Sequence, residues 1–160
     1  EFGHGSTFYF TIPYNIPKKV EPEIIPQHKH IEPKTSGKNL KILIAEDEET
    51  SDMLISIALR PLSHNLLHAH NGVEAVQLCK DNPDTDLILM DIQMPEMDGY
   101  EATRLIRKFN KQIIIIAQTA YALSGEFEKA LQAGCNDYIS KPISKEQLLE
   151  MVASYFGSKS

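Results

Sequence analysis

Short apolar runs alternate with longer segments of helical periodicity over most of the chain, beginning near residue 39. Five of these runs are short and rich in β-branched residues or leucine, which predicts strands. The predicted strands are residues 41–45, 65–69, 86–90, 112–117 and 137–140. The first, third and fourth runs are apolar almost without interruption, which is typical of strands that are buried on both faces of a parallel sheet.

The segments between the strands, and the one after the last strand, have the periodicity of amphipathic helices. In segment 51–60 the apolar residues at this spacing are Met53, Leu54, Ile57 and Ala58. In the helix that begins near residue 98 the expected inward-facing residues are Ala102, Leu105, Ile106 and Phe109. In the last helix the apolar residues are Leu148, Leu149, Val152, Tyr155 and Phe156.

Local signals mark where several of these helices begin and end. Asn71, Asp98 and Ser144 each precede a Glu or Gln by three residues, which is the spacing of a capping box. Gly134 follows the helical segment 123–133, as a C-terminal capping glycine does. Strands and helices that alternate in this way predict an α/β domain with five parallel strands and helices on both faces.

Proline content and charge divide the chain near residue 38. Residues 1–38 hold five of the nine prolines and a net charge of +1, whereas residues 39–160 carry −7, which gives −6 for the 160-residue chain. The recurring prolines predict an extended linker over residues 15–38. The remaining length suits one domain with a single core, which we place at residues 39–158.

The composition also excludes several classes of protein. An acidic domain binds nucleic acid or an anionic membrane poorly, because both carry negative charge. No apolar run approaches the ~18 residues that a membrane span needs. Cys79 and Cys135 are too few for a disulfide framework or a structural zinc site. Two free thiols fit a reducing compartment, so we expect this part of the protein to be cytoplasmic.

Polar residues gather where the predicted strands end. Glu46 and Asp47 follow the first strand, Asp91 the third, Thr119 the fourth and Lys141 the fifth. Ligands of open parallel sheets bind outside the carboxyl ends of the strands, so these side chains are expected to form one site.

Carboxylates that converge repel one another, so some must stay protonated or a hard cation must join them. Oxygen ligands without histidine or thiolate suit Mg²⁺ and disfavour zinc or copper. A carboxylate can also attack a phosphoryl group and form an aspartyl-phosphate. A metal ion, a lysine and a hydroxyl would then hold the three transferred oxygens.

Residues 40 to about 156 resemble the receiver domain of two-component response regulators. The motifs that carry the resemblance are ILIAEDEE (42–49), LILMDIQMPEMDGYE (87–101), IIAQTAYA (115–122) and GCNDYISKPI (134–143). The four motifs occur in this order, at the expected ends of the strands. The resemblance implies a flavodoxin-like fold with five helices around a parallel sheet in the order 2-1-3-4-5.

The resemblance also implies a metal site and a phosphoacceptor. Asp91 matches the aspartate that accepts the phosphoryl group. Asp47 matches a direct Mg²⁺ ligand, and Glu46 its partner acid, which acts through metal-bound water. The backbone carbonyl of Gln93 would be a further ligand, and Mn²⁺ could replace Mg²⁺.

Four further positions take their roles from the same resemblance. Thr119 matches the switch hydroxyl that moves onto the phosphoryl group, and Lys141 the lysine that pairs with it. Tyr138 matches the aromatic switch residue, with plain packing as the simpler interpretation. Pro142 is expected to follow a cis peptide bond, as in the family.

Residues 3–13, GHGSTFYFTIP, resemble the last glycine-rich box and final strand of a histidine-kinase ATP-binding domain. Residues 1–14 would then be the remnant of that domain, and the chain a C-terminal receiver of a hybrid sensor histidine kinase. The parent would be a kinase, a transferase, anchored in the inner membrane if it has a membrane sensor. The amphipathic N-terminal strand could pair with a sheet edge or a second copy.

The function expected from these observations is a phosphoacceptor in a phosphorelay, with self-phosphorylation and autodephosphorylation at Asp91 but no multiple turnover. Its partner would be a phosphohistidine on a kinase dimerisation domain or a phosphotransfer domain, and its output would pass through the fourth helix, fifth strand and fifth helix. One alternative is an aspartate-nucleophile phosphatase, although Gln93 stands where such enzymes have a second acid. The other is a non-phosphorylated interaction module of the same fold.

Overall fold

The computed structural model describes residue 9, residues 39–120 and residues 126–157, with no side-chain description for residues 126 and 127. The chain divides into two units, Glu1–Glu32 and Pro33–Ser160, and every element below belongs to the second. The predicted kinase remnant, linker and N-terminal strand lie outside the described residues, apart from Tyr9.

Five strands and five helices alternate along the described chain. The strands are β1 (Lys41–Ala45), β2 (Asn65–Ala69), β3 (Leu87–Asp91), β4 (Ile114–Thr119) and β5 (Asp137–Ser140). The helices are α1 (Glu49–Leu59), α2 (Gly72–Asp81), α3 (Gly99–Phe109), α4 (Glu126–Ala133) and α5 (Lys145–Phe156). The predicted strands β1, β2 and β5 have the observed bounds, whereas β3 and β4 end one and two residues later than predicted.

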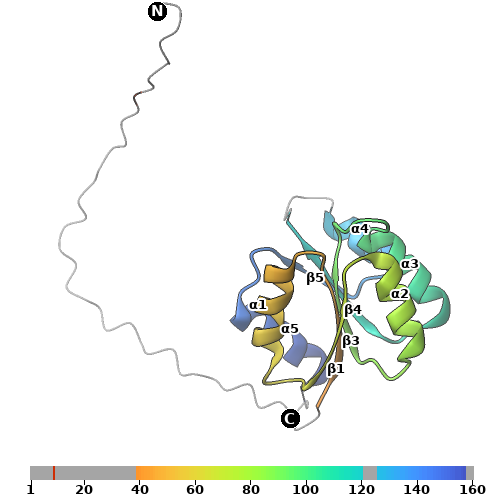
Figure 1. Cartoon of the computed structure of the whole chain (residues 1–160), viewed down its shortest axis with the longest axis horizontal. Coiled ribbons are helices and arrows are strands. Elements are labelled where there is room, and N and C mark those ends of the chain that lie inside the picture. The colour runs from red at the N-terminus through yellow and green to blue at the C-terminus, as the bar shows by residue number, and fades with distance from the viewer. Residues whose placement is uncertain (1–8, 10–38, 121–125, 158–160) are drawn as a thin grey trace, which may run out of the picture. The chain divides into compact units, whose positions relative to one another are not determined.

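All strand pairs are parallel, and the sheet has the order β2-β1-β3-β4-β5. Helices α1 and α5 cover one face, and α2, α3 and α4 cover the other (Figure 1). The expected α/β fold with this strand order is therefore confirmed.

The core consists of two layers, because successive strand residues point to opposite faces of the sheet. Ile44, Leu89 and Ile116 belong to the layer under α1 and α5. Their neighbours along the strands belong to the layer under α2, α3 and α4, which also holds both buried free thiols, Cys79 and Cys135. Strands buried on both faces explain the uninterrupted apolar runs of β1, β3 and β4.

The predicted helix caps are present. The side chains of Asn71, Asp98 and Ser144 each accept a hydrogen bond from the backbone N–H three residues later, at 2.8, 2.7 and 3.1 Å. Gly134 follows α4 with a φ of 107°, a conformation that glycine adopts without steric cost. The side-chain caps at Asn71, Asp98 and Ser144 mark where α2, α3 and α5 begin. They therefore also mark where the loops at the carboxyl edge of the sheet end.

Of the four apolar residues predicted at helical spacing in the first helix, only Ala58 lies on its buried face. Met53 and Leu54 are each 63% exposed and Ile57 is 41% exposed, while Ile55, Ala58 and Leu59 pack against the sheet. Both sets of residues have helical spacing because this helix is apolar around most of its circumference. Phe109, expected to face inward, is also exposed, and the ammonium of Lys80 lies 5.6 Å from the centre of its ring.

None of the helices in the described ranges is both long and apolar enough to cross a lipid bilayer.

Candidate functional site

The predicted site residues converge at the carboxyl edge of the sheet. Glu46 directly follows β1, and Lys141 directly follows β5. Asp91 and Thr119 are the last residues of β3 and β4, not the first residues after them, because the ladder between these strands continues to the pair Asp91–Gln118. Four elements far apart in the sequence therefore contribute to one cluster.

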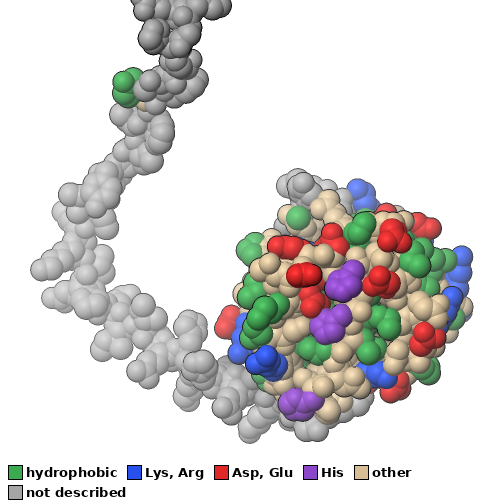
Figure 2. All heavy atoms as spheres, in the orientation of Figure 1, with side chains coloured by type: hydrophobic (Ala, Val, Ile, Leu, Met, Phe, Trp, Pro, Cys, Tyr) green, Lys and Arg blue, Asp and Glu red, His purple; other side chains and the backbone are tan. Residues whose placement is uncertain are grey.

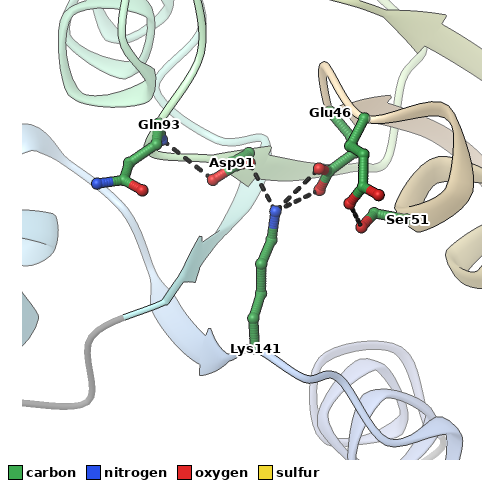
Figure 3. A network of polar contacts seen from close by, with 6 residues as sticks. Glu46, Ser51, Asp91, Gln93 and Lys141 are labelled. Carbon is green, nitrogen blue, oxygen red and sulfur yellow. Dashed lines mark hydrogen bonds and ion pairs between the residues drawn. The ribbon is translucent and has the colours of Figure 1, made fainter. Parts of the chain in front are cut away.

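Lys141 lies at the centre of this cluster (Figure 3). Its Nζ donates hydrogen bonds to both carboxylate oxygens of Glu46, at 2.9 and 2.7 Å, and to Oδ2 of Asp91 at 2.6 Å. Glu46 is 1% exposed and Asp91 is 4% exposed. A single ammonium group thus offsets one of the two negative charges of carboxylates that have little access to water, and a net charge of −1 remains when both acids are ionised.

Glu46, Asp47 and Asp91 form the one group of metal-ligating side chains found among the described residues. One oxygen from each carboxylate lies within 4.8 Å of the others, and Asp47 is the exposed member. An all-carboxylate set with one side open to water fits a hard cation such as Mg²⁺ or Mn²⁺, which keeps several waters when bound. The cluster therefore has the chemistry that the sequence predicted for a metal site.

Burial and charge shift the titration of two groups in the site. Burial raises the pKa of Glu46, and the neighbouring Asp91 carboxylate adds to this, while the hydrogen bond from Lys141 works in the opposite direction. Burial alone would lower the pKa of Lys141, but hydrogen bonds to Asp91 and Glu46 outweigh it and raise that pKa. Lys141 therefore stays charged, and Glu46 is the acid that takes up a proton more easily than usual.

This shift predicts how metal binding depends on pH. Protonated Glu46 cannot serve as an acid partner, so Mg²⁺ affinity should fall as pH drops from neutral toward the usual range of a glutamate, because protons compete for Glu46 above that range. The same raised pKa makes the contribution of Glu46 to metal-free stability fall as pH rises through the pKa of the folded state, because the folded state binds the proton more tightly than the unfolded chain does. Calorimetric Mg²⁺ titrations at a series of pH values measure the effect on affinity.

Glu46→Gln is the control for the pH prediction. It should bind Mg²⁺ more weakly at pH 7 and show a flatter pH dependence. An unchanged pH dependence in this variant would assign the proton to another group.

The loop after β3 holds Asp91 in place. The backbone N–H of Gln93 donates a hydrogen bond to Oδ1 of Asp91 at 3.0 Å (Figure 3). A Cβ atom at Gly99 would overlap the backbone carbonyl oxygen of Asp91, so glycine lets α3 begin directly against the strand end. The metal-binding role of the Gln93 carbonyl stays a prediction.

Thr119 ends β4, Tyr138 lies within β5, and Pro142 follows Lys141 just after β5. Thr119 is buried at the end of β4 and pairs with Ser140 of β5. Tyr138 is half-buried and packs against the core under α2, α3 and α4. The Lys141–Pro142 peptide bond is cis, as expected. The switching roles of Thr119 and Tyr138 stay predictions.

Sequence reasoning missed one polar residue beside the site. Gln118 of β4 is completely buried, next to Asp91 in the sheet. The signal was present, because a glutamine interrupts an otherwise apolar run before Thr119.

Residues 42–153 match the sequence model of a protein family, the response regulator receiver domain. The chain belongs to this family. The chain is 45% identical over 129 residues to hybrid signal transduction histidine kinase G of Dictyostelium discoideum. That match covers 76% of this chain but only 4% of the relative.

Solved receiver domains resemble the chain in both sequence and fold. The receiver domain of a sensor histidine kinase from Pseudomonas aeruginosa, with a magnesium ion coordinated in its active site cleft, is 37% identical, with a TM-score of 0.69. The match covers 76% of this chain and 100% of that one. A response-regulator receiver from Saccharomyces cerevisiae, crystallised with a histidine phosphotransfer protein, is 32% identical, with a TM-score of 0.70 over 74% of this chain and 89% of that one.

Proposed function

We propose that this receiver domain accepts a phosphoryl group from a phosphohistidine onto Asp91, with Mg²⁺ held by Glu46, Asp47, Asp91 and the backbone carbonyl of Gln93. The observation that carries the proposal is the joint contact of Lys141 with Glu46 and Asp91, within a cluster of three acids. A carboxylate nucleophile, acids that can bind a cation and a nearby ammonium group suit the transfer of a phosphoryl group onto an aspartate.

The residues divide the work of the transfer. An oxygen of the Asp91 carboxylate forms a bond to phosphorus as the bond from phosphorus to the imidazole nitrogen breaks. Lys141 moves from the acids to a phosphoryl oxygen, and the Thr119 hydroxyl donates to another. Mg²⁺, when bound, supplies the remaining charge neutralisation. The Gln93 N–H holds Oδ1 of Asp91 and so fixes the orientation of the carboxylate.

Thr119 and Tyr138 are proposed to carry the signal away from the site. Movement of Thr119 toward the phosphoryl group would free space for the half-buried Tyr138 ring to turn further inward. Because the ring packs against the core beside α4 and β5, this shifts a two-state equilibrium on the surface made by α4, β5 and α5.

A titration with Mg²⁺ and beryllofluoride, a mimic of the aspartyl-phosphate, tests this function against the two alternatives. Saturable NMR shifts at Asp91, Thr119 and Tyr138 are expected. Sustained hydrolysis of phosphate esters would favour a phosphatase instead, and the absence of any beryllofluoride response would favour a non-phosphorylated interaction module.

We further propose that the chain is the receiver of a hybrid histidine kinase. The support is the 45% identity to a Dictyostelium hybrid kinase and the resemblance of residues 3–13 to the end of a kinase ATP-binding domain. Sequencing the gene upstream of Glu1 tests this, because a kinase core should precede it.

The phosphohistidine partner is proposed to dock on α1. Hydrophobic side chains gather over this helix (Figure 2), and Met53, Leu54 and Ile57 are exposed there. Leu54 and Ile57 line a groove of about 620 Å³ that Lys141 and Ile143 also line, so the apolar surface is continuous with the site. An apolar patch beside a reactive group suits a helical partner that must deliver its phosphoryl group to Asp91.

Leu54→Asp should therefore slow phosphotransfer from a phosphohistidine protein by about tenfold or more, since it places a charge in the apolar contact. Labelling by acetyl phosphate, which needs no docking surface, should stay unchanged. The control is Leu131→Asp, at an exposed leucine of α4 on the other face of the sheet. Equal slowing by the two substitutions would contradict docking on α1.

A further inference from the structure

Gln118 is a buried polar residue that the proposed chemistry does not use. Its side chain is 0% exposed, and neither its Oε1 nor its Nε2 has a hydrogen-bond partner within the described ranges. An amide removed from water without a partner is costly, and such groups are rare in native proteins, so this one calls for an explanation. The position of Gln118 in the sheet indicates what that explanation is.

Gln118 lies on the same face of the sheet as the reactive carboxylate. Leu89 and Ile116 belong to the core layer under α1 and α5, and Asp91 and Gln118 each stand two residues further along their strands. Side chains two residues apart in a strand share a face, so both point to the α1/α5 side. Asp91 and Gln118 are paired across β3 and β4, which places their backbones ~5 Å apart.

The side chain of Lys141 crosses the strand that carries Gln118. The backbone N–H of Lys141 donates to the carbonyl of Thr119 at 2.8 Å, so its backbone lies beside the end of β4. Its ammonium reaches Asp91 on β3 and Glu46 after β1, and β4 lies between β5 and β3. The lysine stem therefore passes over the end of β4, and its ammonium takes up one acceptor position on Asp91, the residue that pairs with Gln118 across β3 and β4.

We propose that Gln118 is a positioning residue for the phosphoacceptor, whose amide hydrogen-bonds the Asp91 side chain when Lys141 leaves it for the phosphoryl group. This inference rests on the proposed function. In the metal-free state Lys141 satisfies Oδ2 of Asp91 and the amide is unpartnered. In the phosphorylated state Nε2 of Gln118 donates a hydrogen bond to a carboxyl oxygen of Asp91, so the part of the burial cost that comes from Nε2 is relieved in that state alone. The glutamine thereby shifts the equilibrium toward the active state.

Gln118→Met tests the inference, because methionine keeps the length of the side chain and removes its polar atoms. Without metal, the variant should melt at the same temperature as the parent or higher, since an unpartnered amide has been removed. With saturating Mg²⁺, its affinity for beryllofluoride should fall about tenfold, which is the loss of one hydrogen bond to a charged group. Gln118→Leu should behave in the same way and guards against a packing effect peculiar to methionine.

Ser56→Ala is the matched control. Its hydroxyl is likewise buried without a partner among the described residues, but it lies two turns into α1, ~10 Å from the start of that helix. This variant should bind beryllofluoride like the parent.

A melting temperature that is unchanged or higher, together with a lower affinity for beryllofluoride, distinguishes a positioning role of Gln118 from a purely structural one. The inference is overturned if both Gln118 variants bind beryllofluoride as tightly as the parent, or if affinity falls only in proportion to stability. A parent protein that does not bind beryllofluoride with Mg²⁺ would overturn the proposed function itself, and with it this inference.

Discussion

Asp91→Asn abolishes labelling by acetyl phosphate and by a phosphohistidine donor, if Asp91 is the phosphoacceptor. An amide is a far weaker nucleophile than a carboxylate, and it also removes one of the three acids that could hold a cation. We expect a loss of at least about a thousandfold in the labelling rate, close to the detection limit of a radioactive assay. The fold should survive, because asparagine has the same shape and can still accept the hydrogen bond from Gln93.

The matched control for this substitution is Asp98→Asn, seven residues away on the exposed cap of α3. Asparagine is as good an N-cap as aspartate, so α3 should keep its start and labelling should be unaffected. Labelling of Asp91→Asn at the parental rate would place the acceptor elsewhere and refute the proposed mechanism.

Lys141→Met has the second largest expected effect. The substitution leaves Glu46 and Asp91, both almost fully buried, without their shared ammonium. Removing one partner of a buried ion pair costs about 3 kcal/mol or more, so the metal-free protein should unfold at clearly lower urea concentration. Mg²⁺ should restore much of this stability, because a divalent cation can take over the neutralisation of the acids. Phosphoryl transfer should stay slow even with Mg²⁺, since no ammonium remains for the phosphoryl oxygens.

Urea unfolding of Lys141→Met with and without Mg²⁺ measures both effects. The control is Lys41→Met, which breaks an ion pair with the exposed Asp84 and should change stability little. If the metal-free stability of Lys141→Met equals that of the parent, the ion pairs of Lys141 with Glu46 and Asp91 do not stabilise the fold.

The fold could be predicted from the sequence because its signals are local. Strands buried on both faces have uninterrupted apolar runs, and helix starts carry a capping residue such as Asn71 or Ser144. Periodicity failed in the first helix, where two apolar stripes compete. Only tertiary packing decided that Ile55 and Leu59 face the sheet while Leu54 faces outward.

The residues of the site could also be predicted, because parallel strands bring their carboxyl ends to one edge. The contacts within the site could not. That Lys141 bonds both Glu46 and Asp91 depends on how far a flexible side chain reaches across β4. The importance of Gln118 depends on its burial and on the absence of a partner in the described chain, neither of which a single residue type reveals.

The two thiols offer a practical route to watching the switch. Cys79 and Cys135 are buried, and burial raises the pKa of each above its usual value, so both stay protonated and unreactive near neutral pH. A cysteine introduced on the exposed side of α4 would therefore take up a fluorescent maleimide selectively, with the native thiols left in place. The chain contains no tryptophan, so a single introduced tryptophan would provide a second, independent reporter whose fluorescence does not overlap with that of any native indole.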